Sequence, residues 1–131
     1  MKRREAREHI FKLLFSGHDG TLPEGGVEYY CRDNEIKGKD AREILTKVEN
    51  IFSNLEKIDS LIEGNVKGYT FDRISKVSLA AMRLGVYEII FDETIPDGVA
   101  ISEAMEIAAE YEDEKTKAFV NGVLGSVARG K

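Results

Sequence analysis

The sequence predicts an all-α protein, a compact bundle of about six or seven helices. Three observations support this fold class. The chain has only two prolines, no stretch of any length alternates like a strand, and apolar residues recur at helical spacing. With 131 residues, 42% of them hydrophobic and 33% charged, the chain is long enough to form one domain around one core.

The first expected helix covers residues 4–16. Ala6, Ile10 and Leu14 belong to one apolar stripe, since they lie four positions apart. Gly17 follows directly and marks the end of this helix.

The segment 19–39 is rich in turn-forming residues and leaves room for one short helix at about 27–32. Asp40 is expected to cap a long helix after it. Apolar residues with alternating spacings of four and three form its seam: Ile44, Val48, Ile51, Leu55, Ile58 and Ile62. The pattern predicts one uninterrupted helix, packed within the bundle and ended by Gly64 and Asn65.

After Gly68 we expect a short turn over residues 69–74 and then the central helix. Residues 76–91, KVSLAAMRLGVYEIIF, are apolar on nearly every side, which is typical of a helix surrounded by others. Arg83 within it is expected to be a paired, partly buried arginine. The side chains predicted to be largely inaccessible are Ala80, Ala81, Leu84 and Tyr87.

Two further helices complete the expected bundle. Residues 100–111 are amphipathic, with an acidic side formed by Glu103, Glu106 and Glu110. The last helix is expected to start at Thr116 as N-cap and to reach about residue 127. Gly122 and Gly125 inside it predict the close approach of another backbone, because glycine is otherwise unfavourable in a helix.

The sequence offers no catalytic constellation and predicts no enzyme, no metal and no cofactor. Phosphate-binding and dinucleotide-binding glycine motifs are absent, and His9 and His18 have no metal-ligand spacing. Cys31 is the only cysteine, which excludes an internal disulfide and fits a reducing cytosol. The apolar run 10–15 is too short for a signal peptide or a membrane span, so we expect a cytoplasmic protein.

Charge is distributed unevenly along this acidic chain, whose net charge is −5. Residues 1–12 hold five basic and two acidic groups, and residues 115–131 hold four basic groups and no acid. Residues 84–114 hold ten acids and no lysine or arginine. Such a division suggests two different partners.

The basic start of the chain allows two interpretations. On a helix, Arg3, Arg4 and Arg7 share one side that continues to Phe11 and Phe15, and arginines followed by aromatics suit the phosphates and bases of single-stranded RNA. The alternative is a frayed basic terminus with both phenylalanines in the core.

The residues from 73 onward resemble the C-terminal half of the NusB family of transcription antitermination factors. The resemblance rests on Arg73, on MRLGVYE around Arg83, on the IPxxVAIxEA pattern at 95–104 and above all on KAFVNGVL at 117–124. It implies two small helical bundles side by side, about 1–68 and 69–131, within one RNA-binding domain. It also implies a non-enzymatic role: binding the boxA element of nascent RNA together with NusE, a ribosomal protein, so that RNA polymerase reads through terminators.

The resemblance also implies which residues meet each partner. The RNA-binding positions are Lys2, Arg3, Arg4, Arg7, Lys115, Lys117 and Phe119. The acidic side with Glu103, Glu106 and Glu110 suits a basic ribosomal protein. Whether the free protein forms a homodimer through its RNA side stays open.

Ser78, Leu79 and Ser102 depart from residues common in the family, which leaves the details of the protein contact open. Two alternatives remain at this point. One is a helical adaptor that binds only proteins. The other is the NusB-like domain of a ribosomal RNA cytosine methyltransferase, which would require the sequence to be a piece of a longer protein.

Overall fold

The computed structural model describes residues 1–68 and 70–131, and in these ranges it confirms the all-α prediction. The helices are α1 (Arg3–Ser16), α2 (Gly26–Asp33), α3 (Gly38–Ser53), α4 (Leu55–Asn65), the short 3₁₀ helix η1 (Phe71–Arg73), α5 (Lys76–Phe91), α6 (Asp97–Tyr111) and α7 (Thr116–Arg129). The described residues contain no strand. Tyr69, the first residue of the expected turn, lies outside the described residues.

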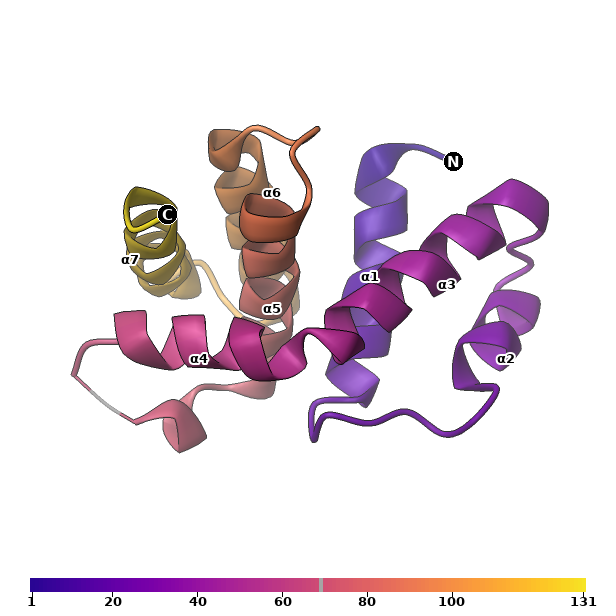
Figure 1. The fold of residues 1–131 in the computed structure, drawn as a ribbon, viewed down its shortest axis with the longest axis horizontal. Coiled ribbons are helices and arrows are strands. Elements are labelled where there is room, and N and C mark those ends of the chain that lie inside the picture. The colour runs from indigo at the N-terminus through magenta and orange to yellow at the C-terminus, as the bar shows by residue number, and fades with distance from the viewer. Residues whose placement is uncertain (69) are drawn as a thin grey trace.

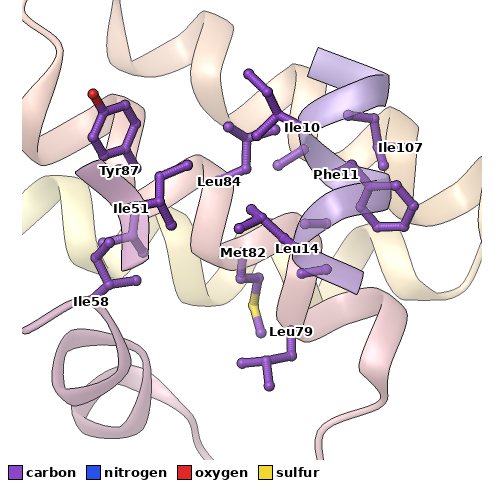
Figure 2. Packing of buried hydrophobic residues seen from close by; sticks show 14 of the residues in the cluster. Ile10, Phe11, Leu14, Ile51, Ile58, Leu79, Met82, Leu84, Tyr87 and Ile107 are labelled. Atoms are coloured by element: carbon purple, nitrogen blue, oxygen red, sulfur yellow. The ribbon is translucent and has the colours of Figure 1, made fainter. Parts of the chain in front are cut away.

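Helix α5 is the centre of the fold, as its sequence predicts. It packs against α1, α3, α4, α6 and α7 (Figure 1). Ala80, Ala81, Leu84 and Tyr87 are all buried, which confirms the prediction for these four residues. Figure 2 shows side chains of α5 and α1 meeting in this core. The helix begins at a Ser75 cap, whose Oγ accepts a hydrogen bond from the backbone N–H of Ser78 at 3.1 Å.

The helices form two groups along the long axis of the molecule. In Figure 1, α1, α2 and α3 lie on the right and α5, α6 and α7 on the left, while α4 continues the line of α3 toward α7. Helix α1 also packs directly on α5, so the two groups share the buried surface of the central helix.

The prediction of one long helix over residues 40–65 is wrong, because the chain breaks at Asn54 into α3 and α4. The cause is local. The Asn54 side-chain amide donates to the carbonyl of Asn50 at 2.8 Å, and the Ser53 hydroxyl donates to the same carbonyl at 3.1 Å. These bonds compete with the helical backbone pattern. The apolar seam nevertheless stays inside on both sides of the break.

Three helix starts differ from those predicted. Asp40 lies in the first turn of α3, which begins after Lys37 without a side-chain cap. Helix α6 begins earlier than predicted, directly after Pro96, whose φ of −60° suits a helix start. Thr116 is the first residue of α7, and the capping acceptor is Asp113, whose carboxylate oxygen accepts the Thr116 N–H at 3.1 Å.

The close approach of another backbone that was expected at the glycines of α7 is not found at either glycine. A Cβ at Gly122 would have no atom within 4 Å, and one at Gly125 would meet only the Arg129 side chain. In α5, by contrast, a Cβ at Gly85 would lie 2.6 Å from a methyl group of Leu124. Helices α5 and α7 therefore pack closely at Gly85, a contact that the sequence around Gly122 does not indicate.

Candidate nucleic-acid interface

The three arginines of the first helical turns do not share one surface. Arg7 is buried, with 6% of its surface exposed. Its Nε donates to the Glu88 carboxylate at 2.9 and 3.2 Å, and its Nη1 donates to Glu103 at 3.3 Å. The assignment of Arg7 to RNA is therefore corrected: its guanidinium joins α1 to α5 and α6.

Arg4 lies at the surface of the same ion network. Its side chain is 64% exposed and donates from Nη2 to one Glu103 oxygen at 2.5 Å and from Nε to the other at 3.2 Å. This hydrogen-bonded pair lowers the pKa of the Glu103 carboxyl and raises the pKa of the Arg4 guanidinium. Arg4 is thus positioned by α6 while its cation stays accessible to a partner.

Lys2 and Arg3 are exposed, and in the part of the chain that the structure describes their side chains have no ion pair and no hydrogen bond. Arg3 faces a cleft of about 460 Å³ between α1, α3 and the α5–α6 connection. Arg3 and Arg4 therefore project from neighbouring sides of α1.

The start of α7 supplies a second group of cations close to Arg4. Lys115 is exposed, and within the described residues it has no ionic partner. Lys117 pairs with Glu114 at 2.8 Å and with Glu106 at 3.1 Å. Arg4 lines a groove of about 240 Å³ between α1 and α6, and the other charged side chains that line it are all carboxylates: Glu8, Glu103, Glu106, Glu110 and Glu114. Arg4 and Lys117 consequently flank the same groove and lie on one side of the molecule.

The acidic side of α6 is largely engaged inside the molecule. Glu103 binds Arg4 and Arg7, and Glu106 binds Lys117. Among the described residues, Glu110 alone of the three predicted acids has neither an ion pair nor a hydrogen bond. Two of the three acids that were expected to meet a protein, Glu103 and Glu106, therefore hold cations that were expected to meet RNA.

Three aromatic side chains, Phe11, Phe15 and Tyr111, lie together beyond the arginines of α1. Phe11 is buried, whereas Phe15 is 41% exposed and Tyr111 is 37% exposed. The Phe11 ring lies with its centroid 4.8 Å from that of Tyr111 and 6.2 Å from that of Phe15. Phe119 is half-buried and packs against the core. Tyr111 belongs to this group of aromatic side chains, and the sequence analysis did not single it out. The available signal was its position one helical turn after Ile107, which is buried.

Two charged side chains inside α5 have structural partners. Arg83 donates to both carboxylate oxygens of Asp59 at 2.8 Å and to the His18 carbonyl at 2.9 Å, which confirms the expected paired arginine. Burial raises the pKa of the Glu88 carboxyl even though Arg7 lies beside it. The only sequence signal for Glu88 is that an acid interrupts an otherwise apolar helix.

No group of three metal-binding side chains occurs in residues 1–68 and 70–131. None of the helices described has the length and apolar character that crossing a membrane requires.

Comparison with known proteins shows similarity to the NusB family along nearly the whole chain. The model of the NusB family matches residues 4–129. Transcription antitermination protein NusB of Finegoldia magna is 36% identical over 132 residues, which cover 100% of this chain and 96% of that protein.

Two solved structures have the same fold. NusB of T. maritima superposes with a TM-score of 0.87 at 33% identity, covering 98% of this chain and 92% of that one. A structure of the antitermination factors NusB and NusE in complex with dsRNA superposes with a TM-score of 0.86 at 31% identity, covering 98% of this chain and 97% of that one.

Proposed function

The chain belongs to the NusB family, and we propose that it is a transcription antitermination factor. In this role it binds boxA-type RNA of nascent transcripts together with the ribosomal protein NusE, and so promotes read-through by RNA polymerase. Homologues named as transcription antitermination proteins and a similar structure containing NusE and RNA support the proposal. The function requires no catalytic step, and its place is the cytoplasm, where it meets nascent RNA.

The observation that carries this proposal is the grouping of cations around α1 and the start of α7. Arg4 lines a groove that also holds five carboxylates, Lys117 pairs with two of them, Glu106 and Glu114, and Lys115 follows Glu114 in the chain. Exposed arginines and lysines on one side of a molecule attract the phosphates of RNA. We propose that Lys2, Arg3, Arg4, Lys115, Lys117 and Phe119 form the RNA-binding surface.

When RNA binds to this surface, its phosphates replace carboxylates as the partners of Arg4 and Lys117. Glu103 holds Arg4, and Glu106 and Glu114 hold Lys117, each in contact with water on at least one side. A phosphate replaces these carboxylates as the partner of each cation. Each of these pairs has one exposed and one largely covered partner, so the exchange costs less than breaking a buried pair would, and binding becomes sensitive to salt.

The direct test measures fluorescence anisotropy of labelled RNA with the full chain, with and without purified NusE. A short boxA-like single strand, its duplex and a scrambled single strand are the probes. We expect the boxA strand to bind more tightly than the scrambled strand, and more tightly still with NusE. No binding of any RNA at low salt, with or without NusE, would leave the protein-only adaptor as the function.

The first variant to test removes two cations, Arg4→Gln with Lys115→Gln. We expect weaker RNA binding and a salt dependence of log Kd that is flatter by about 0.7 for each phosphate that the variant no longer binds. The free energy of unfolding should change little, because both side chains are exposed. Lys39→Gln, an exposed change on α3, is the matched control. An unchanged salt slope in the double variant would exclude these two residues from the RNA surface.

The acidic side of α6 gives a second, separable prediction. Glu106→Lys with Glu110→Lys should slow association with NusE, because a basic partner loses electrostatic steering. The same variant releases Lys117 from Glu106, so RNA binding without NusE should become stronger. Stopped-flow association rates at low and high salt check the first effect. Equal rates for variant and parent at low salt would show that these acids do not steer NusE.

A further inference from the structure

Residues of α2, of α3 and of the turn between them line another groove. In Figure 1, α2 and the start of α3 lie at the end of the molecule remote from α7. We call this groove the α2–α3 groove. Its volume is about 420 Å³, and its apolar walls are formed by Val27, Cys31, Ile36, Ala41 and Leu45. Neither the RNA surface nor the acidic side of α6 includes any of these residues.

The groove exists because α2 is short and packs mainly against α3. Val27 and Cys31, one helical turn apart, are its buried residues. The chain then turns through two left-handed residues, Glu35 with φ +56° and Gly38 with φ +58°, which places Ile36 between the two helices. The walls are thus built by the local fold and are open along one side.

The rim of the α2–α3 groove is basic. Arg32, Lys37 and Arg42 line it, together with a single carboxylate, Glu28. In the part of the chain that the structure describes, none of these three cations has an ion pair or a hydrogen bond from its side chain. Arg4, Arg83 and Lys117, by contrast, are all paired. Unpaired cations around an apolar groove are complementary to a partner with apolar anchors and acidic flanks.

The chemistry of the walls separates a protein partner from RNA. No aromatic side chain is among the residues that line the groove, so bases have no ring on which to stack. Val27, Cys31 and Ile36 form a buried floor, and Ala41 and Leu45 form the partly exposed wall. Such an aliphatic surface suits apolar anchors on one face of a helix. We propose that the α2–α3 groove binds an acidic amphipathic helix of a partner protein, which is a contact beyond RNA and NusE.

The test uses three defined probes and the full chain with isotope-labelled methyl groups. One probe is a helical peptide of about 14 residues, four turns, with leucines on one face and glutamates on the other. The second is the same peptide with lysines in place of the glutamates, and the third is a short oligouridylate. Methyl shifts of Val27, Ile36 and Leu45 report on the α2–α3 groove, and the rate of Cys31 alkylation gives an independent reading.

We expect the acidic peptide to shift these methyl groups and to slow alkylation of Cys31, and the basic peptide to do neither. Arg32→Glu with Arg42→Glu should weaken binding of the acidic peptide at least about tenfold at low salt. Arg73→Glu, an exposed reversal in η1, should leave it unchanged. Equal binding by the double variant, equal binding of the basic peptide, or no shift with the acidic peptide would overturn the proposal. Shifts caused by the oligouridylate alone would overturn it in favour of a nucleic-acid contact.

Discussion

Arg7→Met should lower the free energy of unfolding by about 3–5 kcal/mol, the cost expected when one partner of a buried ion pair is removed. Arg7 donates two hydrogen bonds to Glu88, which is itself 3% exposed, and a third to Glu103. Methionine keeps most of the volume of the side chain but leaves the Glu88 carboxylate without its hydrogen-bonded cation, and Lys47 is then the cation that acts on it. Chemical unfolding followed by circular dichroism measures the loss.

The loss should depend on pH in a definite direction. Burial already raises the pKa of the Glu88 carboxyl, and without the Arg7 guanidinium its pKa rises further. A carboxyl whose pKa is higher in the folded state than in the unfolded state is protonated preferentially when folded. Stability then falls as pH rises from the unfolded pKa to the folded pKa. The destabilisation caused by Arg7→Met should therefore be smaller at about pH 5 than at about pH 7.

Two companion variants identify the cause. Arg7→Met combined with Glu88→Leu should recover much of the lost stability, since no unpaired charge remains buried. Arg4→Met, with its exposed side chain, should leave the free energy of unfolding nearly unchanged while weakening RNA binding. If Arg7→Met proved as stable as Arg4→Met, the buried pair would not hold α1 against α5.

Arg4 is exposed and Arg7 is buried, and the sequence alone does not predict this difference. The residues that form the basic cluster and the helix that carries them are visible from composition and period. Which arginine turns inward depends on where α5 and α6 lie against α1, and Glu88 and Glu103 are far away along the chain. A helical period assigns residues to faces, but it does not say which face another helix covers.

The fold shows the same limit. Five of the six residues of the predicted apolar seam are buried, because burial follows the helical period: Ile44, Val48, Ile51, Ile58 and Ile62. Leu55, beside the break, is only partly buried. The break at Asn54 leaves this spacing intact, and its signal is the local pair of Ser53 and Asn54. The need for glycine at position 85 cannot be seen in the neighbouring sequence, because it depends on contact with Leu124 in another helix.

Leu84→Ala should lower the free energy of unfolding by about 2–5 kcal/mol, the range for a leucine truncated inside a packed core. Leu84 is 2% exposed and lies in the middle of α5 (Figure 2). Its neighbours belong to a central helix that five other helices contact, so they have little freedom to fill the cavity. Leu61→Ala, at a half-buried position of α4, is the control and should cost less.

The same variant tests whether residues 1–68 and 69–131 form one domain. Helix α5 contacts α1, α3 and α4 from the first half as well as α6 and α7 from the second. A cavity at Leu84 therefore weakens packing on both sides, and we expect a single unfolding transition at a lower midpoint. Circular dichroism reports on all helices and tyrosine fluorescence on a few sites, and both should give the same midpoint if unfolding is two-state. Two separate transitions, with only one moved by Leu84→Ala, would show instead that the halves unfold independently.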